Sequence, residues 1–382
     1  MKYKLLSVSK IADEKDKTIN IGDYIQALAA SQFYPVVDGF VDRDEDLKDY
    51  DGEPCVIIMN GWYMHSPENW PPSDKIEPLF VAFHINSVAK DMMLRAESLE
   101  YLKRHEPIGC RDTNTMDLLK QHGIDSYFSG CLTLTLGYKY HSNAKSNEFY
   151  IVDPLMNANM NGKNTFKALI ELIAHPLDVY KLNTEKGLNL HPGRNFLKKV
   201  IRTSLYYREY KKIFGREMLM NAIYISHDNG DFYKNNFTSD NERLREAERL
   251  IKMYAKAKFV LTSRIHCALP CLGIGTPVVY LENFHDIEES KCRMGGLREL
   301  FNIIRVDNGV LKPLFESSIP ISPYNPPSNK KKWKPLAEDL IKKCSELTPP
   351  RPSESPYLND KNDACLLLLF IFNICSDERR AA

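Results

Sequence analysis

The sequence has little that would mark a nucleic-acid-binding, membrane-spanning or disulfide-rich protein. Its 51 basic and 50 acidic residues leave almost no net charge, which gives no reason to expect nucleic acid as the main partner. The apolar stretch Ala364–Cys375 has only twelve residues, whereas a helix needs about 20 to cross a bilayer. The nine cysteines have no regular spacing, which favours free thiols in a reducing compartment over a disulfide framework.

Several functional signatures are also missing. The N-terminal stretch MKYKLLSVSKIADEKD becomes charged too early for the apolar region of a signal peptide, so we expect a cytoplasmic protein. There is no P-loop and no GxSxG motif, which removes the usual signs of a kinase-type nucleotide site and of an α/β-hydrolase. The glycine pair at Gly273–Gly275 precedes a predicted strand instead of following one, which argues against a dinucleotide site.

Short apolar strands alternate with amphipathic helices along most of the chain, a pattern typical of parallel sheets covered by helices on both faces. Strands are expected at Lys4–Val8, Cys55–Met59, Leu79–Phe83, Pro107–Cys110, Phe149–Val152, Ala222–Ser226, Phe259–Thr262, Val278–Leu281 and Ile303–Val306. Helices are expected at Gly22–Phe33, Met92–Arg104, Thr113–His122, Thr165–Ala174, Arg194–Phe214, Asp240–Ala257, Gly296–Phe301 and Leu336–Glu346.

At 382 residues the chain is too long for one ordinary core, so we expect more than one domain. We predict an α/β fold with two Rossmann-like domains that face a cleft, residues 1–145 and 146–315. The polar segment YHSNAKSNE lies at the boundary between them. Residues 316–382 are expected to form a Pro-rich loop, a C-terminal helix and a hydrophobic tail.

The stretch FVLTSRIHCALPCLGIGTPVVYL, Phe259–Leu281, places Arg264 and His266 between two apolar runs. Phe259–Thr262 is expected to be a buried strand, and the apolar residues that follow His266 have helical spacing. Arg264 and His266 would then lie at the carboxyl end of a strand, which is where open parallel sheets bind ligands. The alternative is structural: a surface arginine beside a hydrogen-bonded histidine.

Other polar residues are expected at comparable places. They are Asn20 and Asp23 at the entry to the first helix, and Asn60, His84, Arg111, Asp112, His227 and Asp228 at strand ends. Thr113 is expected to cap the helix after Arg111. Each residue has an ordinary interpretation as a cap or a buried histidine, but in parallel sheets they would converge on one cleft. Arginines and helix N-termini both bind phosphate and carboxylate, so the set predicts a site for a small phosphorylated acid.

Three motifs give the chain a resemblance to the polysaccharide pyruvyl transferase family over about residues 1–310. They are NIGD at Asn20–Asp23, GCRDTNTMDLLKQHGI at Gly109–Ile124 and LTSRIHCALPCLGIGTPVV at Leu261–Val279. The last motif is the most specific, with a strand, Ser-Arg-x-His, a small-residue helix and Gly-x-Pro. Where many relatives have a Gly-rich turn, this chain has Asn60-Gly61-Trp62, a departure that suggests a different acceptor.

The resemblance implies the two-domain fold of B-type glycosyltransferases, with the acceptor on residues 1–145 and the donor on residues 146–315. It implies transfer of a pyruvyl group from phosphoenolpyruvate, as co-substrate and without a further cofactor, to a hexose of a capsule or exopolysaccharide precursor. The product would be a pyruvate ketal. The sugar acceptor is expected to be linked to a lipid diphosphate, which places the enzyme in the cytoplasm at the inner face of the membrane.

Roles in that reaction can be assigned to the residues above. His266 is expected to be the catalytic acid or base, because protonation of the enol carbon of phosphoenolpyruvate needs a proton donor with a pKa near neutrality. Arg264 is expected to hold phosphate or carboxylate. The donor-binding set is Arg264, Arg111, Ser263 and His227. The acceptor-binding set is Asn20, Asp23, Asn60 and His84.

Two other functions stay open at this point. One is a nucleotide-sugar glycosyltransferase of the same fold, in which Glu282 would hold a ribose; the other is a non-catalytic glycan-binding member. No metal is expected, because His266, Cys267 and Cys271 match no common zinc spacing and have no evident fourth ligand. Cys267 and Cys271 are expected to be small core residues.

Membrane contact is a separate question. The expected helix Arg194–Phe214 has seven basic residues and one acidic residue, interleaved with aromatics. Such a helix can lie on an anionic membrane surface. Its alternative is a solvated helix that buries a stripe of Leu, Ile and Tyr.

Overall fold

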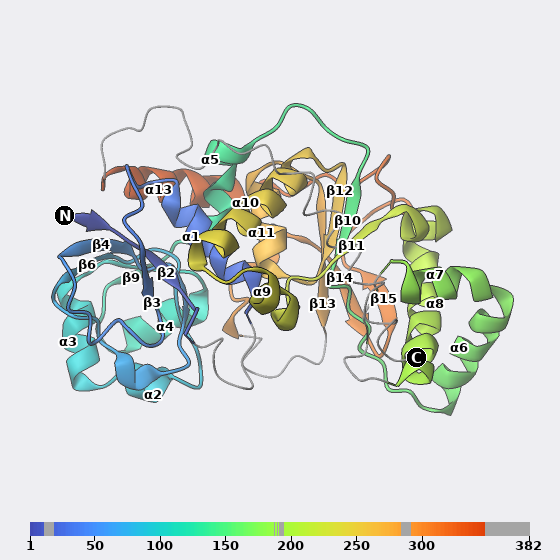
Figure 1. Ribbon diagram of the computed structural model, residues 1–382, viewed down its shortest axis with the longest axis horizontal. Coiled ribbons are helices and arrows are strands. Elements are labelled where there is room, and N and C mark those ends of the chain that lie inside the picture. The colour runs from blue at the N-terminus through green and yellow to red at the C-terminus, as the bar shows by residue number, and fades with distance from the viewer. Residues whose placement is uncertain (11–18, 187, 189, 191–194, 284–291, 348–382) are drawn as a thin grey trace.

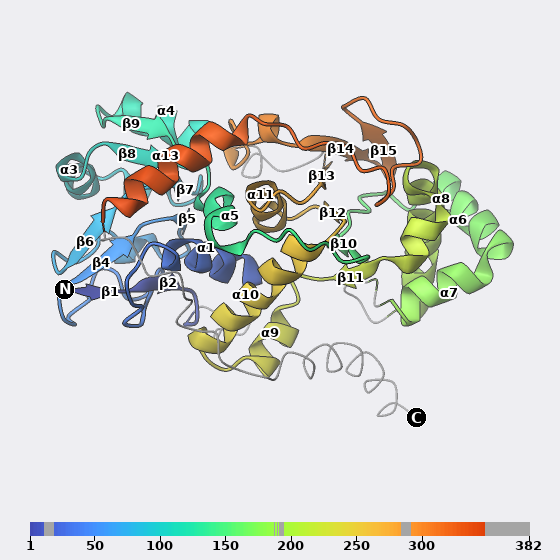
Figure 2. The ribbon, with the colours of Figure 1, turned by 90° about the horizontal axis from the view of Figure 1, so that it is seen from above.

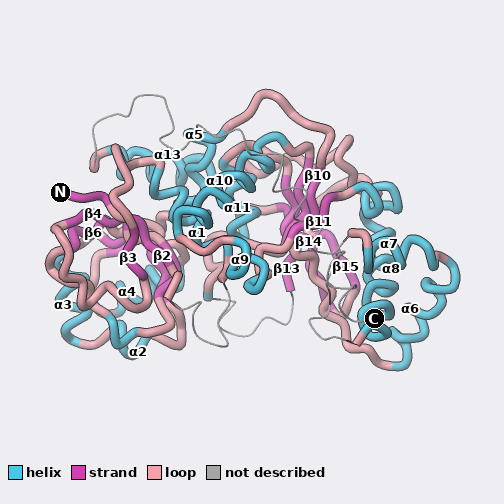
Figure 3. Tube along the Cα trace, in the orientation of Figure 1, coloured by secondary structure: helices cyan, strands magenta, loops and turns pink. Residues whose placement is uncertain are grey.

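The computed structural model describes residues 1–10, 19–186, 188, 190, 195–283 and 292–347, and it has the α/β fold that the alternating pattern predicts (Figure 1, Figure 3). Parallel strands lie in both halves of the chain, and helices pack around them (Figure 1). The apolar stretch Ala364–Cys375 lies outside the described residues. None of the helices among the described residues is long and apolar enough to cross a membrane.

The N-terminal half contains three groups of parallel strands. Their bounds are β1 Lys2–Tyr3, β2 Leu5–Ser7, β3 Phe40–Asp42, β4 Cys55–Ile58, β5 Gly61–Tyr63, β6 Ile76–Leu79, β7 Phe83–Ile85, β8 Ile108–Cys110 and β9 Ser126–Phe128. The strand orders are β1–β4–β6, β2–β3 and β5–β7–β8–β9. Because β1 runs on into β2, β4 into β5 and β6 into β7, the groups read as one interrupted parallel layer.

The C-terminal half is built on one sheet with the order β11–β10–β12–β13–β14–β15. Its strands are β10 Phe149–Val152, β11 Ile223–Ile225, β12 Phe259–Thr262, β13 Val278–Asn283, β14 Asn302–Asp307 and β15 Val310–Pro313. All neighbours pair in parallel except β14 and β15. The order reverses at β10, and the carboxyl ends beside such a reversal are where doubly wound sheets bind ligands.

Helices cover both halves. They are α1 Ile21–Ser31, α2 Lys90–Met93, α3 Ala96–Arg104, α4 Thr113–Gln121, α5 Gly137–Tyr140, α6 Gly162–Ala174, α7 Pro176–Thr184, α8 Phe196–Asn221, α9 Gly230–Asn236, α10 Asp240–Lys256, α11 Ile265–Gly273 and α13 Trp333–Ser345. Short 3₁₀ turns occupy η2 Pro67–Asn69, η3 Leu132–Leu136 and η4 Arg298–Leu300.

The largest hydrophobic core is shared by the two halves. It joins α1 and η3 of the first half to α10 and α11 of the second, and Figure 2 shows α1 beside α10. The C-terminal helix α13 also returns to the N-terminal half, where Leu336 lies against Gly130 (Figure 2). This shared core holds the carboxyl end of β12 against the start of α1. The domain boundaries at residues 145 and 315 stay a prediction.

Some expected elements differ in the structure. The strand predicted at Leu79–Phe83 is wrong, because β6 ends at Leu79, β7 begins at Phe83, and Ala82 between them has a φ of 55°. The helix predicted at Gly296–Phe301 is only the turn η4, since Gly296 has a φ of 76°. The helix predicted at Met92–Arg104 is divided into α2 and α3.

The sequence-based expectation lacks several short or partly polar elements, which include β3, β5, β9, β15, α5, α7 and α9. The basic helix extends further than expected, to Asn221, with a break at Gly215, whose φ is 74°. It buries Leu205, Tyr206, Tyr210 and Ile213, which is the buried stripe of the alternative interpretation.

The tightest contact between the helical layers is the crossing of α5 and η3 over the end of α11. A Cβ added at Gly137 would lie 1.9 Å from the carbonyl oxygen of Gly273. A Cβ at Gly273 would lie 2.3 Å from that of Leu134. Only glycine allows the backbones to approach this closely.

Replacing Gly137 by alanine is therefore expected to lower the free energy of unfolding by about 1–3 kcal/mol, the usual cost of overpacking. Gly162→Ala is the matched control, because a Cβ there meets nothing within 4 Å. Urea denaturation of both variants measures the difference. Equal stability of the two variants would contradict the close crossing.

Candidate functional site

The carboxyl ends of β10, β11 and β12 form one polar cluster. Their registers align Val152 with Ile225 and with Thr262, so the residues that follow these strands meet at one edge. Arg264 donates to Asp153 through Nε at 2.7 Å and to Asp228 through Nη2 at 3.0 Å. The positive charge of Arg264 is thus already balanced by two carboxylates.

Asp153 organises this edge. Its carboxylate also accepts from the Ser226 hydroxyl at 2.7 Å and from the backbone N–H of His227 at 2.9 Å. The Ser263 hydroxyl donates to the Asp153 carbonyl at 2.5 Å. Asp153 has a φ of 43°, a left-handed conformation that aspartate tolerates better than most residues.

His266 lies in the first turn of α11 and contacts the other half of the chain. A Cβ added at Gly22 would lie 3.0 Å from His266 Nδ1, and the backbone N–H of Ile21 donates to the His227 carbonyl at 3.3 Å. Asn20 caps α1 by accepting from the N–H of Gly22 at 2.8 Å. The motifs at Asn20–Asp23 and Leu261–Val279 are therefore adjacent in space.

The ring of His266 is buried, and its Nε2 has no hydrogen-bond partner within the described residues. Burial lowers the pKa of His266 well below its usual value, and the charges of Arg111 and Arg293 lower it further. In the free protein His266 is therefore a neutral imidazole at pH 7.

Arg111 is the most unusual side chain of the site. It follows β8 and is fully buried, yet its Nε, Nη1 and Nη2 find no acceptor in the part of the chain that the structure describes. Burial lowers the pKa of Arg111 to about 10, and the neighbouring charge of Arg293 acts in the same direction. A buried, unpaired guanidinium is costly unless an anion completes it.

His84, at the centre of β7, forms a pair with Asp112. Its Nδ1 lies 2.5 Å from Asp112 Oδ2, and its Nε2 has no partner among the described side chains. Burial and the charge of Arg111 lower the pKa of His84 to about 4. Asp112 also caps α4 by accepting from the Thr115 N–H at 2.8 Å, so the cap is Asp112 and not Thr113.

His227 is more constrained than His84 and His266. Its Nε2 lies 2.7 Å from the Tyr254 hydroxyl, and its Nδ1 is buried without a partner within the described chain. Burial lowers the pKa of His227 to about 4. A role for His227 in donor binding stays a prediction.

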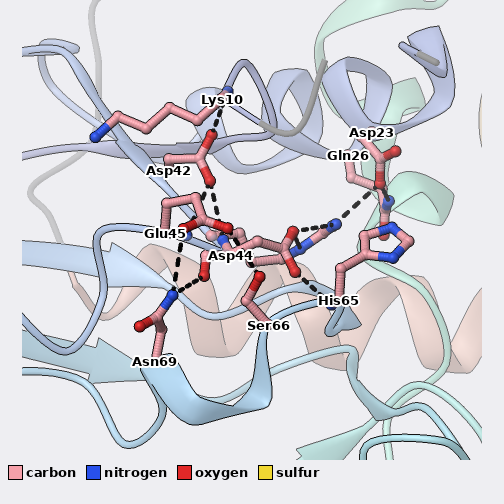
Figure 4. Close-up of polar contacts among 10 residues, drawn as sticks. Lys10, Asp23, Gln26, Asp42, Asp44, Glu45, His65, Ser66 and Asn69 are labelled. Carbon is pink, nitrogen blue, oxygen red and sulfur yellow. Dashed lines mark hydrogen bonds and ion pairs between the residues drawn. The ribbon is translucent and has the colours of Figure 1, made fainter. Parts of the chain in front are cut away.

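The remaining acceptor candidates are engaged in contacts within the N-terminal half. Asn60 donates to the Gln26 carbonyl at 2.9 Å. Asp23 accepts from Arg43 at 3.2 Å, and Arg43 also donates to Asp44 at 3.2 and 3.0 Å. Figure 4 shows Asp23 at one end of this network and Asp44 at its centre.

The network continues away from the site through Asp44 and Glu45. Glu45 accepts from the Ser66 hydroxyl at 2.8 Å, and Asn69 donates to the Asp44 carbonyl at 2.7 Å (Figure 4). The Arg43 guanidinium carbon lies 5.7 Å from the Trp62 ring, close enough for a cation–π contact. This network holds Asp23, and with it the start of α1, in place.

Asp153, Arg43 and Arg293 are not among the residues expected from the sequence. Asp153 directly follows a predicted strand, so its position was a usable signal. Arg43 follows β3, a strand that is too short to stand out. Arg293 is placed by a loop contact, in which the Thr113 N–H donates to the Gly295 carbonyl at 3.2 Å, and no local pattern reveals it.

The arrangement combines anion binding with proton transfer. Arg111 offers three unpaired nitrogens, and Arg293 adds positive charge that lowers the pKa of both His84 and His266. Each of the two histidines keeps one ring nitrogen without a partner among the described residues. A site of this kind can hold phosphate or carboxylate and can accept or donate a proton beside it.

Glu282 and the two cysteines of α11 are engaged within the fold. Glu282, the ribose-binding candidate of the glycosyltransferase alternative, binds Arg298 at 2.8 Å and Arg305 at 3.4 Å. Cys267 and Cys271 are buried in α11. Among the described residues, no three His, Cys, Asp or Glu side chains gather as metal ligands would.

Comparison with known proteins gives one family match. The family model described as polysaccharide pyruvyl transferase matches residues 20–286. This range includes Asn20, Arg111 and His266 and covers more than half of the chain. No curated protein matches the sequence.

The unpaired burial of Arg111 predicts an inverse effect on stability. Arg111→Met should raise the free energy of unfolding of the ligand-free protein, because a buried charge without a partner is removed. Arg43→Met, the matched control, should lower it by about 3–5 kcal/mol, because Asp23 and Asp44 would lose their partner. Denaturant titration of both variants in phosphate-free buffer makes the comparison, and a loss of stability in Arg111→Met would refute it.

Proposed function

The chain belongs to the polysaccharide pyruvyl transferase family, and on that premise we propose that it transfers a pyruvyl group from phosphoenolpyruvate to a hexose of a surface polysaccharide precursor. The product is a cyclic ketal that bridges two hydroxyls of the sugar. The observation that carries the proposal is the buried guanidinium of Arg111, which has no partner within the described residues and lies within electrostatic range of His266 and His84. Phosphoenolpyruvate supplies what this site lacks, an anion with two charged groups.

Arg111 is proposed as the main contact of the donor anion, with Arg293 as a second positive charge. A guanidinium binds phosphate or carboxylate in a bidentate way. Arg264, expected to bind the donor, has Asp153 and Asp228 as partners, so its charge contributes less. We propose that Arg264 and Ser263 instead hold the strand ends that position His266 and His227.

The reaction needs one proton on the enol carbon. Protonation of the methylene carbon gives an oxocarbenium-like centre, to which one sugar hydroxyl adds with loss of its proton. The bond to the phosphate oxygen then breaks, phosphate leaves, and the second hydroxyl closes the ketal with loss of its proton. One of these two protons replaces the one delivered to carbon, and the other leaves with phosphate.

His266 is proposed as the proton donor. In the free protein its imidazole is neutral, partly because of the positive charge around it. A bound anion on Arg111 offsets that charge and raises the pKa of His266. Binding of phosphoenolpyruvate would therefore favour the protonated form of His266, which then donates its proton to the substrate. Before the donor binds, His266 would stay neutral.

His84 is proposed as the base for the acceptor hydroxyl. Asp112 holds its Nδ1 at 2.5 Å, which leaves Nε2 as the nitrogen that faces the reaction. Its pKa of about 4 keeps this nitrogen unprotonated at neutral pH. Asp23, Asn20 and Asn60 would then shape the acceptor side through the start of α1.

The proposal also covers the domain arrangement, the acceptor and the place of the reaction in the cell. We propose that the two halves are Rossmann-like domains arranged as in B-type glycosyltransferases, with the donor on residues 146–315. The acceptor would be a sugar linked to a lipid diphosphate, used in capsule or exopolysaccharide synthesis at the cytoplasmic face of the membrane. No metal is needed, since arginines carry the charge stabilisation.

Donor choice tests the proposal. Phosphoenolpyruvate is expected to raise the thermal midpoint of the protein, because a ligand of the native state stabilises it by mass action. Arg111→Lys should weaken this donor binding more than Arg264→Lys does, since Arg264 is already paired. Thermal shift titrations with phosphoenolpyruvate measure both effects.

UDP-, GDP- and CMP-sugars serve as the comparison ligands. Stabilisation by one of them and not by phosphoenolpyruvate would replace the pyruvyl transferase proposal with the glycosyltransferase alternative. A larger loss of affinity in Arg264→Lys than in Arg111→Lys would return the main anion contact to Arg264.

His266→Gln tests the proton donor. Turnover, followed as phosphate release with a galactoside or another hexose acceptor, should fall by roughly 10²–10⁴, the usual worth of general acid–base catalysis. Calorimetric titration of the donor near pH 7, in two buffers of different ionisation enthalpy, should show proton uptake that the variant lacks. The exposed His141 is the control, and His141→Gln should change neither result.

Normal turnover of His266→Gln would move proton transfer to His84 or His227. Donor binding without proton uptake in the parent protein would show that His266 stays neutral in the complex.

A further inference from the structure

The segment between β10 and β11 forms a helical unit, α6–α8, that stands at the end of the molecule opposite the N-terminal half (Figures 1 and 2). Its outer surface is apolar. Six exposed side chains follow one another along α6 and α7, and we call them the apolar face: Phe166, Leu169, Ile170, Ile173, Leu177 and Tyr180. Ile173 is 81% exposed and Leu177 is 74% exposed.

The spacing of the apolar face is that of one side of a helix. Phe166, Leu169, Ile170 and Ile173 recur at intervals of three and four residues, so they share one side of α6. Phe196 and Leu197, at the start of α8, are also exposed. Single exposed apolar residues are normal, but a concentration of them in one unit marks an interaction surface.

The acidic and basic residues of α6, α7 and the start of α8 differ in their exposure to solvent. The acidic residues within α6, α7 and the first two turns of α8 are Glu171 and Asp178, and both are buried. Glu171 binds Lys211 at 2.5 Å and Arg208 at 3.4 Å. Asp178 binds Arg216 at 2.7 Å. These carboxylates are thus neutralised inside the unit.

The basic residues beside the apolar face are exposed instead. Lys163, Lys181 and Lys198 have exposed side chains, and none has an ionic partner among the described residues. Lys211, which belongs to the basic helix expected at Arg194–Phe214, is held by Glu171. Within α6, α7 and the first two turns of α8, the exposed charged side chains are therefore basic. The exposed acidic residues of the unit are Glu185, directly after α7, and Glu217, near the end of α8.

We propose that the apolar face, with Lys163, Lys181 and Lys198 around it, docks the protein on the surface of an anionic lipid bilayer. The exposed Phe, Leu and Ile side chains would enter the interfacial layer, while the lysines contact lipid phosphates. A second copy of the chain is the less favoured occupant, since a symmetric contact would bring these lysines close to one another. The inference stands on the surface alone and goes beyond the proposed chemistry.

Vesicle flotation of the full chain tests this docking surface, with phosphatidylcholine vesicles that contain phosphatidylglycerol or lack it. The protein is expected to float with the anionic vesicles and to bind the neutral ones far more weakly. Ile173→Asp/Leu177→Asp should abolish flotation. Val36→Asp/Val88→Asp, the matched control at exposed valines elsewhere, should leave it unchanged.

The charge component is measured separately with Lys163→Gln/Lys198→Gln. Each basic residue near an anionic surface is worth about a five-fold factor in partitioning, so this double variant should bind roughly 25-fold more weakly. Lys90→Gln/Lys256→Gln removes the same charge from exposed lysines elsewhere and should have little effect. This pair keeps the test decisive even where the aspartate variant fails to fold.

Several results would overturn the inference. They are no flotation of the parent protein, flotation that persists in both patch variants, equal binding to neutral and anionic vesicles, and a parent dimer that Ile173→Asp/Leu177→Asp dissociates in light scattering. Flotation needs no donor, and the phosphoenolpyruvate thermal shift of the same variants is read independently. A failure of the docking surface is therefore distinguishable from a failure of the proposed reaction.

Discussion

The uncompensated charge of Arg111 is the constraint around which the site is arranged. Burying a guanidinium without a carboxylate is unfavourable by several kcal/mol, so such a residue persists only where the rest of the fold holds it. Arg43 and Arg264 show the ordinary solution, because each is paired with two aspartates. Arg111 has no hydrogen-bonded carboxylate among the described residues. The charges of Asp112 and Asp23 act on it from a distance, and the charge of Arg293 opposes them. An anion that binds Arg111 would remove this unfavourable free energy of burial, and its binding would be favoured by that amount.

Burial, together with the charge of Arg111, lowers the pKa of His84 and of His266. A positive neighbour in a buried site disfavours imidazolium, so His84 and His266 are neutral before a ligand is present. The two histidines differ in their hydrogen-bond partners, and this difference gives them different proposed roles. Asp112 orients His84 and leaves Nε2 free to accept a proton, whereas His266 depends for its charge on what occupies the site. In the proposed reaction, anion binding and proton transfer would therefore both depend on one electrostatic arrangement.

The site exists only because the two halves of the chain share a core. Arg111 and His84 come from the first half, and His266 and Arg264 come from the second. The contact of Gly22 with His266, the glycine crossing of Gly137 and Gly273, and the return of α13 hold these halves together. The α6–α8 unit lies outside that core, and its exposed face is free to serve a different purpose from the chemistry.

The local sequence pattern predicted the α/β class, most of the helices, and the position of Arg264 and His266 where β12 meets α11. These features could be predicted because they follow from hydrophobic periodicity within a few residues. The family also follows from local motifs. The short strands β3, β5 and β9 did not, because a few residues carry too weak a period. Ion pairing was decided by tertiary structure alone: Arg264 and Arg111 look alike in sequence, yet one meets Asp153 and Asp228 and the other meets no carboxylate among the described residues. Those partners lie far apart along the chain, and only the packing of two sheets through a common helical layer determines which charges are balanced.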